Sequence, residues 1–316
     1  MKHRFLRSSV MACLLMGVVT GGCLFTSCND WTDPEEVDYT TQEPKEQNPE
    51  LWARYMESLR VYKRERPHYI AYAHFDNGQP SKNEGSFLRS LPDSLDMVTI
   101  ANAENITDYD REDIPTLQEK STRVLYHVDY AAKMPELANA AALGAWLDKA
   151  VATATELQLD GFSFSGVPLY AGDEAEQAAR KEAARLIVSK LSATGKMLVF
   201  EGDPAFVDAG DLSKLSYIVL NTAEITDAVT LKLLVSNAIE TYTLPKDKLL
   251  LGAEIGAILT DENKNKLNAV TEMTNRIVSL GPLSGLAIYA IGKDYYSAET
   301  NYPVCQMAIQ MMNPSK

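Results

Sequence analysis

The chain is poor in cysteine and in positive charge. Its 316 residues include four cysteines, and 30 lysines and arginines stand against 43 acidic residues, for a formal net charge of -13. Such an acidic chain is a poor partner for the phosphate backbones of nucleic acids, so we expect no nucleic-acid binding. Beyond residue 27 the sequence also lacks any apolar run long enough to span a membrane as a helix.

The first 27 residues have the features of a secretory signal. Lys2, Arg4 and Arg7 open the chain without any acidic residue, and an apolar run follows at 10–19. This run is too short for a permanent membrane span. The pattern predicts a signal peptide over residues 1–27 that is removed on export. A plain secreted protein cut near Ser27 is the alternative.

Two cysteines could accept a lipid at the end of this signal, Cys23 and Cys28. A small residue precedes each of them, as in bacterial lipoproteins. We expect Cys28 to be lipidated, because the polar pair Asn29-Asp30 follows it directly. The sequence Ser-Cys-Asn-Asp resembles surface lipoproteins of Bacteroides type, which implies a cell-surface location on the outer membrane.

The remaining cysteines leave no pair for an intrachain disulfide. If Cys28 carries the lipid, Cys13 and Cys23 are lost with the signal and Cys305 is the only thiol left. Cys305 stands in an apolar helical pattern near the end of the chain, which predicts a buried core position.

The rest of the chain divides into a polar segment and an α/β domain. Residues 28–48 are polar and acidic without apolar periodicity, which predicts a lipid anchor and flexible linker. In the domain predicted at 49–316, β-rich runs alternate with helical patterns. The strands expected are 68–75, 97–101, 123–128, 161–165, 197–200, 217–220, 249–253 and 286–290. The clearest helices expected are 137–157, 174–191, 227–242 and 262–280, and two more are expected at about 49–65 and 302–312.

Eight strands alternating with helices over roughly 250 residues are typical of a (β/α)8, or TIM, barrel. The alternative is an open doubly wound sheet. That fold would carry a nucleotide-binding glycine loop after the first strand, and the segment 75–80 (Phe-Asp-Asn-Gly-Gln-Pro) is not one. The expected fold class is therefore α/β, a (β/α)8 barrel preceded by the signal peptide and the linker.

In barrels of this kind the functional site lies at the carboxyl ends of the strands. Polar and aromatic residues follow most of the predicted strands there. The candidate ligand-binding residues are Asp76, Asp129, Tyr170, Glu201, Asn221, Glu254, Tyr289 and Tyr295. The tyrosines suit a sugar ligand, because an aromatic face packs well on the apolar face of a sugar ring.

The fourth predicted strand carries the most specific motif. Residues 160–167 read Asp-Gly-Phe-Ser-Phe-Ser-Gly-Val. They resemble the strand-four motif of family 18 glycoside hydrolases, the chitinases and endo-β-N-acetylglucosaminidases, whose pattern is Asp-Gly-x-Asp-x-Asp-x-Glu. Asp160 matches the first position, Ser163 and Ser165 stand where the later aspartates belong, and Val167 replaces the catalytic glutamate.

The resemblance implies a barrel without its catalytic residues. In the family the glutamate protonates the glycosidic oxygen, and an aspartate orients the substrate acetamide that attacks the anomeric carbon. Valine has no proton to donate, and serine cannot stabilise the cationic intermediate as a carboxylate does. The end of strand six also departs from many active relatives, since Asn221 and its neighbours replace a tyrosine there.

Three functions remain open on this basis. The first is a non-catalytic glycan-binding lipoprotein that captures N-acetylglucosamine-containing oligosaccharides for a polysaccharide-utilisation system, with an outer-membrane importer and an endoglycosidase as partners. The second is an active glycosidase using carboxylates of other strands, among them Asp129, Glu201, Asp203 and Glu254. The third is a structural subunit of a surface complex.

No cofactor and no metal are expected. His74 and His127 each begin a His-x-Asp segment with Asp76 and Asp129, a pairing that could bind Zn²⁺. Barrels resembling family 18 need no metal, however, so the resemblance implies that these histidines are not ligands.

Overall fold

The computed structural model describes residues 43–78, 83–168, 170 and 172–314. It divides into two compact units, Met1–Gln47 and Asn48–Lys316, and the described part of the first contains the single-turn helix α1 (Pro44–Gln47). The predicted signal peptide, Cys28 and the alternative Cys23 lie outside the described residues, as does most of the predicted linker. Among the described helices, none is long and apolar enough to cross a membrane.

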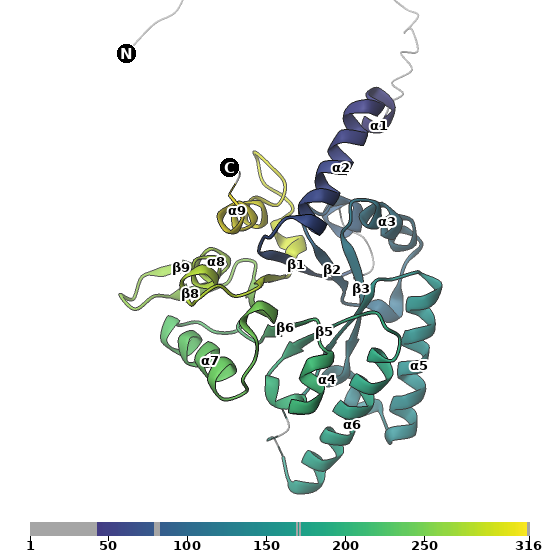
Figure 1. Cartoon of the computed structure of the whole chain (residues 1–316), viewed down its shortest axis with the longest axis vertical. Coiled ribbons are helices and arrows are strands. Elements are labelled where there is room, and N and C mark those ends of the chain that lie inside the picture. The colour runs from purple at the N-terminus through teal and green to yellow at the C-terminus, as the bar shows by residue number, and fades with distance from the viewer. Residues whose placement is uncertain (1–42, 79–82, 169, 171, 315–316) are drawn as a thin grey trace, which may run out of the picture. The chain divides into compact units, whose positions relative to one another are not determined.

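Eight parallel strands of the second unit close into a barrel, so the expected (β/α)8 fold is confirmed (Figure 1). Around the barrel the strands follow the order β1-β10-β7-β6-β5-β4-β3-β2. Their bounds are β1 Ile70–Phe75, β2 Met97–Ile100, β3 Arg123–Asp129, β4 Gly161–Ser165, β5 Met197–Gly202, β6 Tyr217–Leu220, β7 Leu249–Glu254 and β10 Gly285–Tyr289. Chain order and spatial order agree because each connection returns the chain to the next parallel position.

The helices lie outside the ring of strands (Figure 1). They are α2 Pro49–Glu65, α3 Asp108–Glu119, α4 Tyr130–Lys133, α5 Ala140–Glu156, α6 Glu174–Ser192, α7 Ala228–Glu240, α8 Ala269–Ser279 and α9 Pro303–Met312. Helix α2 has the predicted bounds, since Asn48 caps it by accepting a hydrogen bond from the Leu51 backbone N–H at 3.0 Å. Cys305 of α9 is free and fully buried, as predicted.

Strand residues alternate between the helices and the barrel interior. In β4, Phe162 and Phe164 pack in the core beneath the helices, and Ser163 between them faces the barrel interior, where it hydrogen-bonds to β2 and β3. A separate apolar cluster fills the barrel; its buried members are Tyr72, Met97, Leu125, Val199, Val219, Leu250 and Ala287. The alternation fixes which polar side chains can reach the mouth of the barrel.

Two sequence predictions fail locally. The helix predicted over 262–280 begins only at Ala269, because residues Lys266–Asn268 (β9) pair with Ile258–Thr260 (β8) in a small antiparallel hairpin. The last strand ends at Tyr289 rather than at 290, since Ala290 has a φ of 52° and starts a short 3₁₀ helix. Helix α3 was not among the clear patterns, because it holds Pro115 and several charged residues.

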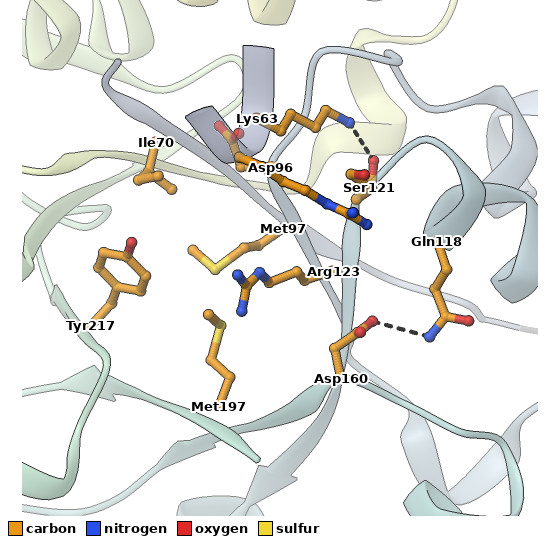
Figure 2. A pocket seen from close by; sticks show the side chains of 12 residues that line it. Lys63, Ile70, Asp96, Met97, Gln118, Ser121, Arg123, Asp160, Met197 and Tyr217 are labelled. Carbon is orange, nitrogen blue, oxygen red and sulfur yellow. Dashed lines mark hydrogen bonds between the residues drawn. The ribbon is translucent and has the colours of Figure 1, made fainter. Parts of the chain in front are cut away.

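Asp160 lies at the amino ends of the strands, opposite the mouth. Its carboxylate accepts hydrogen bonds from the Val124 backbone N–H at 2.8 Å and from the Gln118 amide at 3.0 Å (Figure 2). It lines a cavity of about 350 Å³ together with Arg123, Met197 and Tyr217. Asp160 therefore ties β4 to β3 and α3, which is a structural role.

His68 and Asp96 form a buried pair near this same end of the barrel. One ring nitrogen of His68 lies 2.6 Å from the Arg66 carbonyl oxygen, and the other lies 2.8 Å from an Asp96 carboxylate oxygen. Burial and the charge of Lys63 work against the protonated ring, but the Asp96 hydrogen bond and charge outweigh them and raise the His68 pKa above its ordinary value. The doubly protonated imidazolium satisfies both acceptors.

We therefore expect His68→Gln to cost more stability at pH 5.5 than at pH 8.5. A raised folded-state pKa gives stabilisation that is complete below the unfolded-state pKa and is lost as the pH rises through the folded-state pKa. The loss at low pH is expected to be about 1–3 kcal/mol, typical of a hydrogen bond to a charged group. Urea unfolding of both proteins across this pH range measures it, and a pH-independent difference would contradict the charged pair.

Candidate functional site at the mouth of the barrel

A buried carboxylate occupies the inside of the barrel just below its mouth. Glu201, near the end of β5, is 5% exposed, and its two oxygens accept hydrogen bonds from Tyr72 at 2.5 Å and Tyr289 at 2.7 Å. His74 and His127 place ring nitrogens 3.8 and 3.7 Å from these oxygens. We call these five side chains, from β5, β1, β10 and β3, the Glu201 centre.

The aromatic members of the centre support one another. The His74 ring stacks on Tyr289 with centroids 5.0 Å apart, and it meets His127 edge-on at 4.9 Å. Tyr289 was expected to offer its face to a sugar, but one face of its ring is covered by His74 and its hydroxyl points to Glu201. Its position makes it a support of the carboxylate.

One hydroxyl group, that of Ser163, links the centre to strand four. The Ser163 hydroxyl lies 2.8 Å from Nδ1 of His127 and 2.5 Å from the Thr99 hydroxyl. Ser163 is fully buried, so the position that holds an aspartate in the family pattern holds a small neutral hydroxyl here. Ser165, two residues further along the strand, donates to Asp129 at 2.7 Å.

The electrostatics of the centre favour a charged Glu201. Burial by itself would raise the pKa of Glu201, but the His74 and His127 rings and the two tyrosine hydroxyls outweigh burial and lower that pKa below its ordinary value. Burial lowers the pKa of His127, against the opposing charge of Glu201. Burial and the Glu201 charge raise the pKa values of Tyr72 and Tyr289, so both phenols stay protonated and donate.

Two of the predicted ligand-binding residues meet in a separate pocket beside the centre. Tyr170 and Asn221 line a cavity of about 280 Å³ with Asp203, Glu224 and Tyr242. Tyr170 is 64% exposed, and its hydroxyl donates to Asp203 at 2.7 Å. The Asp203 hydrogen bond raises the pKa of Tyr170 to about 12. This pocket combines an accessible aromatic face with amide and carboxylate groups.

The other predicted residues lie apart from one another. Asp76 accepts a hydrogen bond from the Asn102 amide at 2.6 Å, and Glu254 forms an exposed ion pair with Lys293 at 2.6 Å. The ring of Tyr295 packs against Tyr302 with centroids 5.5 Å apart, so part of its surface belongs to the core.

Sequence reasoning missed Tyr72 and Thr99 and paired the histidines with the wrong acids. His74 and His127 approach Glu201, whereas Asp76 and Asp129 bond to Asn102 and Ser165. The first pair fails because β1 ends at Phe75: His74 faces the barrel interior, while Asp76 lies beyond the strand, where alternation no longer applies, and is exposed. The same alternation places Tyr72 two residues before His74 on the inner face, a signal available from the sequence.

Comparison with known proteins gives a family resemblance over part of the chain and a shared fold. The sequence model described as "Glycoside hydrolase family 18, BT1044-like" matches residues 32–140. The chain resembles the family 18 glycoside hydrolases. The matched segment includes β1 to β3 and ends before β4, so the departures at Ser163, Ser165 and Val167 stand outside it. A search of the curated proteins finds no match.

Solved structures of family 18 proteins share the barrel. A selenomethionine-labelled glutamate-to-glutamine variant of BT1044 has a TM-score of 0.66 at 16% identity, covering 86% of this chain and 96% of its own. The endo-β-N-acetylglucosaminidase of Cordyceps militaris has a TM-score of 0.62 at 19% identity, covering 82% and 95%. A chitinase from Bacteroides thetaiotaomicron has a TM-score of 0.59 at 9% identity, covering 77% and 97%. At these identities the likeness establishes the fold.

Proposed function

We propose that this protein is a non-catalytic, cell-surface lipoprotein of the outer membrane that binds N-acetylglucosamine-containing oligosaccharides. The observation that carries the proposal is a family-18-like barrel with Ser163, Ser165 and Val167 in place of the catalytic carboxylates. Two of the similar solved structures are described as endo-β-N-acetylglucosaminidase and chitinase, which supports this glycan class. Tethered through Cys28, the barrel would hold glycan near an importer and an endoglycosidase of a polysaccharide-utilisation system.

The alternative, hydrolysis by relocated carboxylates, fits the site less well. Inverting and retaining glycosidases need one carboxylic acid that donates a proton to the leaving oxygen. Glu201 is buried and accepts hydrogen bonds on both oxygens, while Glu254 pairs with Lys293. Asp203 accepts from Tyr170 and caps the following 3₁₀ helix. Each of these acids is engaged as an acceptor.

Binding is tested by calorimetric titration of the purified protein with chitooligosaccharides and with N-glycan core oligosaccharides. We expect measurable affinity for at least one of them, and a loss of about 10-fold in Tyr170→Ala, because stacking on a sugar face is worth roughly 1–1.5 kcal/mol. No affinity for any member of a broad glycan panel would refute the proposal.

Tyr55→Ala is the matched control for this titration. Tyr55 is also an exposed tyrosine whose hydroxyl donates to a carboxylate, that of Asp93 at 2.6 Å, but it lies on α2, before β1. It should leave glycan affinity unchanged. Equal losses in Tyr55→Ala and Tyr170→Ala would show that the effect is general destabilisation and would remove Tyr170 from the site.

A further inference from the structure

The Glu201 centre contains a set of metal-ligating atoms that lie outside the lining of the Tyr170–Asn221 pocket. His74, His127 and Glu201 each offer one ligand atom, and these atoms lie within 4.8 Å of one another. The three residues come from β1, β3 and β5 and meet inside the barrel below its mouth. From this arrangement we infer a binding site for one Zn²⁺ ion between the two imidazoles and the carboxylate.

The separations fit ligands that share an ion. The nitrogens of His74 and His127 lie 3.8 and 3.7 Å from the Glu201 oxygens, too far for good hydrogen bonds. Two ligands that each lie about 2.0–2.2 Å from a zinc ion are about 3.3–3.6 Å apart in a tetrahedral site. The two nitrogen–oxygen distances are slightly longer than this separation, and the three ligand atoms lie within 4.8 Å of one another, so the side chains must move closer together to bind one ion.

The Glu201 oxygens keep lone pairs for the ion, whereas Nδ1 of His127 is bonded to Ser163 at 2.8 Å. A carboxylate oxygen has two acceptor positions, and the Tyr72 and Tyr289 hydroxyls take one on each oxygen of Glu201. Coordination through Nδ1 of His127 would release the Ser163 hydroxyl, which keeps its bond to Thr99 at 2.5 Å. Hydrogen bonds from hydroxyls to a ligating carboxylate are the outer shell that orients metal ligands.

Charge and access favour a cation at this place. Among the described residues no lysine or arginine pairs with Glu201, whose ion pairs are with the two imidazoles alone. A carboxylate that is 5% exposed is costly without a positive partner, and a divalent ion supplies one. The His74 side chain keeps 19% of its surface accessible to solvent, so an ion can approach the site from solution on this side.

The ligand types select the metal. Two imidazole nitrogens suit zinc and disfavour Mg²⁺ and Ca²⁺, which prefer oxygen ligands. Two histidines and one glutamate are a zinc set that leaves a fourth position for water or another oxygen.

Titration of tag-free, chelator-treated protein with Zn²⁺ against a chromophoric competitor tests the site. We expect one ion per chain, and at least 100-fold weaker binding in His74→Gln, His127→Gln and Glu201→Gln, since even outer-shell changes commonly cost about 10–100-fold. X-ray absorption of the loaded protein should show imidazole nitrogens around zinc. His68→Gln is the matched control, because it removes a histidine that is bonded to Asp96 instead.

Every result decides the inference. The inference is supported if wild type binds one Zn²⁺ per chain and His74→Gln, a change at a partly exposed residue, loses this binding. The circular dichroism spectrum of His74→Gln should then be unchanged, and His68→Gln should bind zinc as wild type does. Absence of stoichiometric binding overturns it, and so does zinc that survives all three substitutions or is lost in His68→Gln. Glycan titration of the zinc-free protein keeps the outcome separate from that of the proposed function.

Discussion

Incubated with a chromogenic N-acetylglucosamine oligosaccharide, the protein is expected to release no product above the rate measured without protein. By the resemblance to the family motif, Val167 stands in place of the proton donor, and Ser163 and Ser165 stand in place of the carboxylates that support the intermediate. Loss of general acid catalysis costs about 10²–10⁴ in rate, and loss of electrostatic stabilisation costs about 10²–10³. Together they place turnover at least about 10⁴-fold below that of an intact family 18 enzyme.

Glu201→Gln and Glu254→Gln serve as the controls for this assay. The progress curves of wild type and both variants should coincide with the blank at high protein concentration, while an active chitinase shows that the substrate is competent. Hydrolysis by wild type that disappears in Glu201→Gln would establish the relocated-carboxylate mechanism. It would also refute the non-catalytic proposal.

Replacing Gly161 with alanine is expected to destabilise the barrel by about 2–4 kcal/mol, in the range of severe packing changes. A Cβ at Gly161 would lie 2.2 Å from the Met197 carbonyl oxygen and 2.8 Å from the Met197 Cβ. Gly161 pairs with Met197 in register at the start of β4, so the clash falls on a backbone that cannot move without breaking the β4–β5 ladder. Urea unfolding should show a lower midpoint at an unchanged slope.

Gly210→Ala is the matched control, because a Cβ there meets nothing within 4 Å. Its stability should lie within about 0.5 kcal/mol of wild type. The aspartate-glycine pair of strand four thus has a packing reason in this chain that is independent of catalysis. If Gly161→Ala unfolds at the wild-type midpoint, the close approach of β4 and β5 is relaxed in solution and the argument from packing is wrong.

The sequence by itself predicted the barrel and showed where the strand-four segment departs from the family motif. Eight β-rich runs alternating with helical patterns predicted the closed parallel barrel. Hydrophobic periodicity depends only on the order of residues along the chain, so it can be recognised in the sequence. The bounds of α2 and β4 were correct for the same reason. Residues 160–167 showed the family resemblance and also the missing glutamate at Val167, since both follow from residue identity.

Only the tertiary structure decided how the mouth residues combine. Tyr170 and Asn221 are 51 positions apart in the sequence, yet they line one pocket. Asp160, the first residue of the strand-four motif, lies at the other end of the barrel. His74 and His127 meet Glu201 instead of the acids two residues further along the chain, because Asp76 lies beyond the end of β1 and Asp129 is the last residue of β3, where its carboxylate bonds to Ser165. Which inward-facing residues share one height in a barrel depends on the stagger of eight strands, and that register is set by long-range pairing.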